Sequence, residues 1–233
     1  EGALSLYQQA FTALEKQSMS HSSSAVEILK SMSSAQRKLG QLDAAQSSLV
    51  QAQGVLQETS SEKSPQAAGV LRHLGILLAL RGDHSGAIDK YKEALQIHDL
   101  AGTKGSAEAA RVRAFIGESL WMQREYTKAE HWLSTACAIY QEKQLHSNRD
   151  AVYAADSLNA LKVLDVFRRF DASGSGNIAA ESLKEVLRIL VKENPNLGSM
   201  LVQAIVRHTD SKSVRYEFFV RWLFQLDELQ RSQ

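Results

Sequence analysis

The sequence predicts an all-α protein built from repeated helical hairpins. Only 2 of its 233 residues are proline, and 44% are hydrophobic. Proline interrupts helices, whereas the abundant alanine, leucine, glutamine, glutamate and lysine favour them. In residues 71–95, apolar residues recur at helical spacing on both sides of the polar break Arg81-Gly82-Asp83. This stretch therefore predicts two amphipathic helices joined by a tight turn.

The second helix of this hairpin recurs along the chain at an interval of forty-two residues. In each copy, two small residues stand seven apart with a large residue between them. The four copies read Ala3, Tyr7 and Ala10; Ala45, Leu49 and Ala52; Ala87, Tyr91 and Ala94; and Ala129, Leu133 and Ala136. Small residues let helix backbones approach closely, so this register predicts stacked hairpins that pack at the same positions in every repeat.

The first helix of each hairpin also carries a recurring small position. It is Gly75 in the central copy, Gly117 in the following copy and, as a weaker match, Ser33 in the preceding copy. Residues 3–17 correspond to a second helix, with apolar residues at helical spacing but no first helix before it. We therefore expect this end to be an uncapped edge of the array, and any segment that precedes it cannot be read from this sequence.

The hairpins resemble tetratricopeptide repeats (TPRs) of the kinesin-light-chain type. The resemblance covers roughly residues 1–165, and its motifs are Leu74-Gly75-Ile76-Leu77-Leu78, Gly82 to Tyr91 followed by Ala94-Leu95, Tyr126-Thr127-Lys128-Ala129, and Ser157-Leu158-Asn159-Ala160-Leu161. It implies a right-handed α-solenoid whose repeats are longer than the usual thirty-four residues. The last hairpin is a half-repeat at residues 150–165, because Asp171 stands where the next alanine is expected.

The C-terminal part, residues 157–233, resembles a pair of EF-hands that shares its entering helix with the solenoid. Phe167 and Phe170 precede a twelve-residue loop from Asp171 to Ser182, in which Gly176 takes position six and Ile178 position eight. The resemblance implies a four-helix module. It also implies a short β contact between the two loops, through Ile178 and Val214.

The first loop has the frame of a calcium site but few of its ligands. The candidate ligands are Asp171, Ser173, Ser175, the carbonyl of Asn177, and Glu181 one residue before the usual position of a bidentate glutamate. The second loop places Arg207, Thr209, Ser211 and Lys212 at ligand or glycine positions, so it should bind no calcium. We expect a mainly structural module, weak calcium binding at most, and no other cofactor.

Several classes of function are excluded by missing motifs and by charge. The chain has no His-Glu-x-x-His motif, phosphate-binding loop, nucleophile elbow or paired cysteines, so we expect no catalytic activity. A net charge of +1 and the lack of a basic stripe argue against nucleic acid. No apolar run is long enough for a transmembrane segment. Cys137 is the single cysteine, so it has no partner for a disulfide or a zinc site, and we expect it to pack in the core. A reducing compartment is the default.

The concave face of the predicted solenoid is the candidate binding surface. First-helix positions line this face in the TPR family, and here they include Lys30, Arg37, Arg72, Arg111, Glu118, Trp121 and Asp156. Cationic residues predominate among them, which favours an extended acidic peptide or a C-terminal peptide as ligand. Trp121 is the aromatic residue that we expect to contact this ligand. The first hypothesis is therefore a non-enzymatic scaffold for protein–protein interaction.

Two further hypotheses remain open. One is a calcium-responsive regulator, in which weak binding at the first loop modulates the TPR surface. The other is a subunit of a larger assembly, in which neighbours bury the uncapped edge near residues 3–17. The resemblance to kinesin light chains implies a cytoplasmic or cytoskeleton-associated protein. An organellar location stays open, because no targeting segment can be read.

Overall fold

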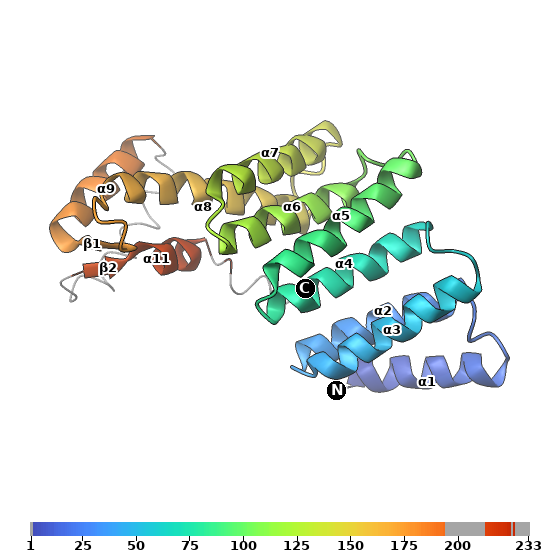
Figure 1. Cartoon of the computed structure of the whole chain (residues 1–233). Helices are drawn as coiled ribbons and strands as arrows, with labels where there is room; N and C mark the ends of the chain where they lie inside the picture. The colour runs from blue at the N-terminus through green and yellow to red at the C-terminus, as the bar shows by residue number, and fades with distance from the viewer. Residues whose placement is uncertain (1, 194–212, 225, 227–233) are drawn as a thin grey trace. The chain divides into compact units, whose positions relative to one another are not determined.

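The protein forms two compact units, residues 1–151 and residues 152–232. We obtained a computed structural model of the chain, which describes all residues except 1, 194–212, 225 and 227–233. Apart from two short strands, the regular structure of the described residues is entirely helical (Figure 1). None of the described helices is long and apolar enough to cross a membrane. Each unit is described by itself below.

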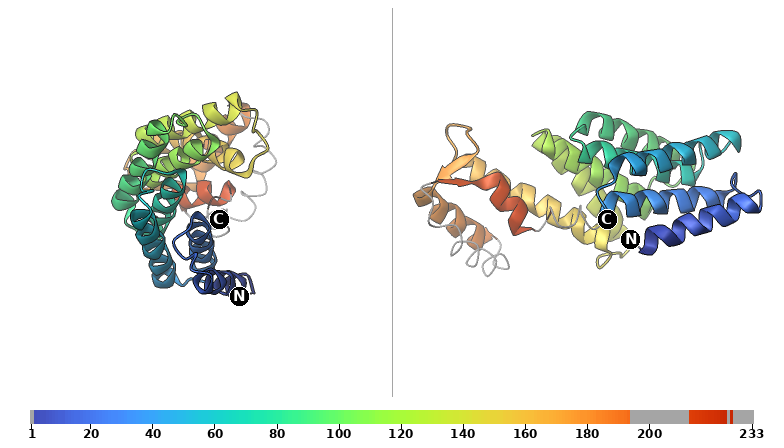
Figure 2. Two further views of the ribbon diagram at one scale, coloured as in Figure 1. Left: turned by 90° about the vertical axis from the view of Figure 1, so that its right-hand side faces the viewer. Right: turned by 90° about the horizontal axis from the view of Figure 1, so that it is seen from below.

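The first unit is an array of helical hairpins. Its helices are α1 (Gly2–Lys16), α2 (Ser23–Lys38), α3 (Leu42–Glu58), α4 (Pro65–Leu80), α5 (His84–Leu100), α6 (Ala107–Met122) and α7 (Tyr126–Glu142). The most extensive contacts join α2 to α3, α4 to α5, and α6 to α7, and successive hairpins stack through α3 on α4 and α5 on α6. Figures 1 and 2 show the resulting solenoid. The three hairpins begin and end at equivalent residues of the forty-two-residue alignment.

Serine caps fix where the first helix of each hairpin begins. The hydroxyl oxygens of Ser22, Ser64 and Ser106 accept hydrogen bonds from backbone N–H groups three residues later, at donor–acceptor distances of 3.2, 3.3 and 3.1 Å. These bonds satisfy N–H groups that have no partner within the helix. Pro65 fits the first position of α4, because no backbone N–H is needed there.

The turns inside the hairpins require a left-handed backbone residue after the first helix. Gly40 and Gly82 take this role with φ of 75° and 85°. Glycine adopts such angles without steric cost. The equivalent residue of the third hairpin is Arg124, with φ of 63°, so the geometry of the turn is kept where the preferred residue is absent.

The small positions predicted from the sequence lie where helices touch. Ala45, Ala87 and Ala129 have 0% exposed surface, as do Ala52, Ala94 and Ala136. The glycines of the first helices face the large residues: a Cβ atom at Gly75 would collide with the ring of Tyr91, and one at Gly117 would lie 2.7 Å from Cγ of Leu133. The register of small and large residues therefore holds the hairpins together.

The second unit contains most of α8 (Arg149–Arg169), followed by β1 (Asn177–Ala179), α9 (Ala180–Glu193), β2 (Ser213–Arg215) and α11 (Tyr216–Leu223). The strands are antiparallel, and Ile178 pairs with Val214, which confirms the predicted β contact. Phe167 is fully buried, with ring centroids 5.8 Å from Tyr216 and 5.7 Å from Phe219. The predicted ligand positions 207–212 and the helix expected before them lie outside the described residues, so the four-helix module stays a prediction.

We predict that Ala87→Leu and Ala129→Leu each destabilise the first unit. A leucine at either position would force two helix backbones apart, at a cost of about 1–3 kcal/mol. Thermal unfolding of the purified variants measures this effect, and we expect the melting temperature to fall by several degrees. Ala138→Leu is the matched control, because Ala138 is exposed on α7. Equal melting temperatures for Ala129→Leu and Ala138→Leu would contradict the packing register.

Candidate functional site

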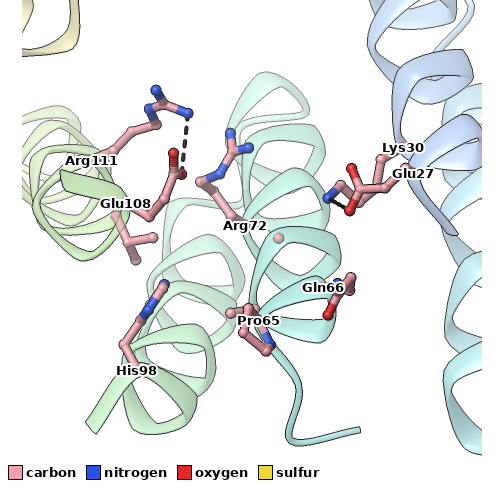
Figure 3. A pocket seen from close by; sticks show the side chains of 11 residues that line it. Glu27, Lys30, Pro65, Gln66, Arg72, His98, Glu108 and Arg111 are labelled. Atoms are coloured by element: carbon pink, nitrogen blue, oxygen red, sulfur yellow. Dashed lines mark hydrogen bonds and ion pairs between the residues drawn. The ribbon is translucent and has the colours of Figure 1, made fainter. Parts of the chain in front are cut away.

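A pocket of about 260 Å³ lies in the first unit where α2, α4 and α6 come together with the last turn of α5. It is shown in Figure 3. Its lining consists of Glu27, Lys30, Pro65, Gln66, Ala68, Gly69, Arg72, His98, Glu108, Arg111 and Val112. The pocket brings together three of the cations that were predicted on the concave face, namely Lys30, Arg72 and Arg111.

Arg72 projects from α4 between two ion pairs, Lys30 with Glu27 on one side and Arg111 with Glu108 on the other (Figure 3). Its Nη2 lies 2.9 Å from Nε2 of His73. Among the described residues, Arg72 forms no ion pair. Burial lowers the pKa of its guanidinium from the ordinary value, and the nearby charge of Arg111 lowers it further.

His73 holds this guanidinium and connects α4 with α2. Burial, followed by the charges of Arg72, Lys30, Arg37 and Arg111, lowers the pKa of His73 well below its ordinary value. The imidazole is therefore neutral and its Nε2 accepts a hydrogen bond from Arg72. The remaining nitrogen, Nδ1, then carries the proton and donates to the hydroxyl of Ser34 at 3.3 Å. His73 fixes Arg72 without neutralising its charge.

Arg111 is held differently, because carboxylates surround it. Its Nε donates to Oδ2 of Asp150 at 2.8 Å, its Nη2 contacts the same oxygen, and its Nη1 donates to Oε2 of Glu108 at 3.2 Å. Burial lowers the pKa of Arg111, but the hydrogen bond and charge of Asp150 outweigh burial and raise it. Arg111, one of the cations predicted to face a ligand, is therefore already engaged by two carboxylates of the chain.

Lys30 and Gly69 shape the other side of the pocket. Nζ of Lys30 lies 2.7 Å from Oε1 of Glu27, a more exposed residue of the same helix. A Cβ atom at Gly69 would stand only 2.9 Å from Nζ of Lys30. The missing side chain at Gly69 therefore lets the ammonium group of Lys30 lie close to α4. With Lys30 and Arg111 paired to carboxylates, Arg72 is the cation lining the pocket that forms no ion pair among the described residues, although the nearby charges of Glu108 and Asp150 favour its charged form.

Two residues predicted on the concave surface are buried instead. Trp121 has 0% of its surface exposed and Glu118 has 6%, so the prediction that they contact a ligand on the surface is wrong. The physical reason is that α6 packs against α5 and α7 and also contacts α4, and residues 114–121 are all buried. Arg37 is also nearly buried, at 9% exposure.

The prediction for Asp156 stays a prediction, because this residue belongs to the second unit. Burial raises the pKa of its carboxyl group above the ordinary value.

His73, Asp150 and the acidic partners of the pocket were not predicted from the sequence. A signal for them exists in the spacing of the contacts. The bonds from Ser34 to His73 and from Arg111 to Asp150 each span 39 residues, which is one repeat less about one helical turn. Polar residues at this spacing face each other across neighbouring first helices.

The loop of the second unit surrounds the carboxylate of Asp171 with hydrogen-bond donors. Oδ1 accepts from the hydroxyl of Ser173 at 2.8 Å and from the backbone N–H of Ser175 at 3.2 Å. Oδ2 accepts from the backbone N–H of Gly176 at 2.7 Å and from the hydroxyl of Tyr216 at 3.1 Å. Burial tends to raise the pKa of Asp171, but these hydrogen bonds outweigh it and lower the pKa to about 2.

The predicted calcium ligands other than Asp171 make different contacts in the structure. Ser173 and Ser175 direct their hydroxyl groups at Asp171. The side-chain amide of Asn177 donates to the carbonyl of Ser175 at 3.2 Å. The side chain of Glu181 lies outside the described part of the chain. Among the described residues, no three His, Cys, Asp or Glu side chains gather into a group that could hold a metal ion.

Comparison with known proteins agrees with the architecture of the first unit. The family model described as tetratricopeptide repeat matches residues 24–99 and 66–142, which together cover slightly more than half of the 233 residues. The matched region contains the three complete hairpins, from α2 to α7. A comparison with curated proteins gave no match. The chain belongs to the tetratricopeptide repeat family.

Proposed function

We propose that the first unit is a non-enzymatic module that binds a protein or peptide partner through a carboxylate placed against Arg72. Tetratricopeptide repeats generally mediate protein–protein interaction. The observation that carries the proposal is the guanidinium of Arg72, which lines a pocket and has no carboxylate partner among the described residues. An acidic side chain or the C-terminal carboxylate of a peptide supplies the missing negative charge.

The energetics favour such a ligand over a neutral one. A guanidinium removed from water loses solvation, and here its only hydrogen-bond partner among the described residues is a neutral imidazole. A hydrogen bond between charged groups contributes about 1.5–3 kcal/mol, more than a neutral one. Lys30 lines the same pocket, but Glu27 of the same helix neutralises its charge.

The kinesin-light-chain type of repeat is also part of the proposal. The helices of the three complete hairpins have 16 or 17 residues, and the hairpins begin at Ser23, Pro65 and Ala107. These long helices and their even spacing support the resemblance to the longer repeats of that type. The subtype bears on the ligand, because longer helices give a deeper concave surface for an extended peptide.

For the second unit we propose an EF-hand-like pair whose role is mainly structural. The order of helix, loop, strand and helix supports it, as do the pairing of Ile178 with Val214 and the φ of 81° at Gly176. The alternative is a calcium-responsive regulator. It is favoured by Asp171, whose carboxylate keeps the first position of the loop, but the donors around this carboxylate would have to share it with the ion.

We predict that Arg72→Gln weakens partner binding at least tenfold and that Arg72→Glu weakens it further. Glutamine removes the charge, whereas glutamate repels a ligand carboxylate. Peptides selected from a random library on the wild-type protein provide the probe, and fluorescence anisotropy measures their affinity. Lys92→Glu is the matched control, because Lys92 is exposed on α5 and does not line the pocket. Selected peptides without a required carboxylate, or unchanged affinity in Arg72→Glu, would contradict the proposal.

Substitution of Arg111 cannot test ligand binding alone, because it would also disturb the ion pairs of the folded chain. In Arg111→Glu the new carboxylate would face Asp150 and Glu108, which now bind the guanidinium. We predict that this substitution lowers the melting temperature of the protein, whereas Arg72→Gln leaves it nearly unchanged. A thermal melt of both variants checks this difference, and an unaltered melt for Arg111→Glu would show that the ion pair is dispensable.

We predict that calcium binds the full chain no more tightly than about 10⁻⁴–10⁻³ M, the range of the weakest EF-hand sites. The first loop supplies one carboxylate at its ligand positions, and five hydrogen-bond donors already hold it. Isothermal titration of the chain with calcium measures the affinity, and Asp171→Ala identifies the site. Micromolar binding that disappears in Asp171→Ala would favour the calcium-responsive regulator instead.

A further inference from the structure

His98 uses only one of its two ring nitrogens in hydrogen bonds within the described part of the chain. It belongs to the last turn of α5, has 8% of its surface exposed and lines the same pocket as Arg72. Its Nδ1 lies 3.0 Å from Oγ1 of Thr103, whereas its Nε2 has no hydrogen-bond partner among the described residues. Figure 3 shows the imidazole directed toward the side of the pocket on which Arg72 and Glu108 lie.

The contacts of Thr103 determine which nitrogen of His98 carries the proton. The hydroxyl of Thr103 donates to the backbone carbonyl of His98 at 3.2 Å, and this bond uses its single hydrogen. Oγ1 therefore accepts from Nδ1, which carries the proton. In a neutral imidazole the other nitrogen is then an acceptor, so Nε2 offers a lone pair to the pocket.

The imidazole of His98 is neutral at neutral pH. Burial is the largest effect and lowers the pKa of His98 from its ordinary value. The charges of Arg113 and Arg72 lower this pKa as well, whereas those of Glu108 and Asp99 oppose the shift without reversing it. The lone pair at Nε2 is therefore present under ordinary conditions.

The described neighbours of His98 in the pocket supply no donor to Nε2. Glu108 is a carboxylate and can only accept, and Arg72 directs its Nη2 at His73. A ligand that places a carboxylate on Arg72 displaces water from the pocket, and Nε2 then loses its solvation unless the ligand donates to it. A hydrogen-bond donor beside the ligand carboxylate avoids this loss.

We propose that His98 selects a peptide residue with a backbone N–H beside its carboxylate, which places the carboxylate on Arg72 and donates the N–H to Nε2 of His98. The proposal rests on the function proposed for Arg72 and specifies the ligand chemistry of the same site. A volume of about 260 Å³ is below the usual range for drug-sized ligands, so both groups come from one residue. The C-terminal residue of a chain and an internal aspartate share this chemistry.

Replacement of one amide by an ester in the probe tests the hydrogen bond to His98. The probe is the tightest carboxylate-dependent peptide from the random library, synthesised with either an amide or an ester at the N–H of its carboxylate-bearing residue. The ester keeps the shape of the backbone and removes the donor. We expect the ester to bind the wild-type chain about tenfold more weakly than the amide. We expect His98→Leu to bind both forms equally, as measured by fluorescence anisotropy.

The comparison of both peptides on both chains isolates the hydrogen bond, because general damage to the pocket by His98→Leu would weaken both peptides alike. His131→Leu is the matched control, since His131 is exposed on α7 and does not line the pocket, and it should keep the preference for the amide. Amidation of the peptide C-terminus and replacement of its aspartate by asparagine identify which carboxylate binds.

A second measurement needs only the wild-type chain, which matters because His98 is nearly buried. In ¹⁵N NMR spectra of the imidazole we expect Nε2 to be unprotonated in the free chain. Its resonance should shift toward that of a hydrogen-bonded nitrogen when the amide peptide binds, and less when the ester binds.

The results that contradict this inference differ from those that contradict the function proposed for Arg72. An equal preference for the amide in wild type and His98→Leu, or a protonated Nε2 in the free chain, would overturn the role of His98 and leave the carboxylate site intact. A library that yields no carboxylate-dependent peptide would overturn both.

Discussion

The close approach of helix backbones at alanine and glycine positions is the constraint on which the first unit depends. Ala87 has no exposed surface and Gly75 lies against the ring of Tyr91, so neither position has space for a larger side chain. Because dense cores tolerate little extra volume, these contacts fix both the distance between helices and their relative register. All other features of the solenoid follow from a register that can shift only at high cost.

The pocket is one consequence of that register. Once the hairpins are stacked, residues 39 positions apart on neighbouring first helices face each other, as Ser34 faces His73 and Arg111 faces Asp150. Lys30 and Gly69 stand at the same spacing, and there the glycine lets the ammonium group lie close to α4. The residues that stand 39 positions apart therefore determine the polar contacts between neighbouring first helices. The forty-two-residue register of small and large residues determines stability.

The sequence predicted features that recur and missed features that depend on one neighbour. The small positions could be found because each is repeated, and the pairing of Ile178 with Val214 follows from the frame of the loops. Trp121 was misplaced because periodicity identifies the face of a helix but not whether a second helix covers it. Asp150 was missed because its importance comes from Arg111, in the preceding hairpin.

Asp171 and Arg72 form no ion pair among the described residues, and they differ in how the chain stabilises their charges. Asp171 receives five hydrogen bonds from its own loop and from Tyr216, so its charge is stabilised without any ligand and its pKa falls to about 2. Among the described residues, Arg72 has one hydrogen-bond partner, a neutral imidazole, and burial lowers its pKa although the charges of Glu108 and Asp150 oppose this shift. A charge that is already satisfied gains little from a counter-ion, whereas an unsatisfied one gains more. Under the proposed function, a carboxylate ligand therefore gains more at Arg72, the cation lining the pocket that forms no ion pair among the described residues.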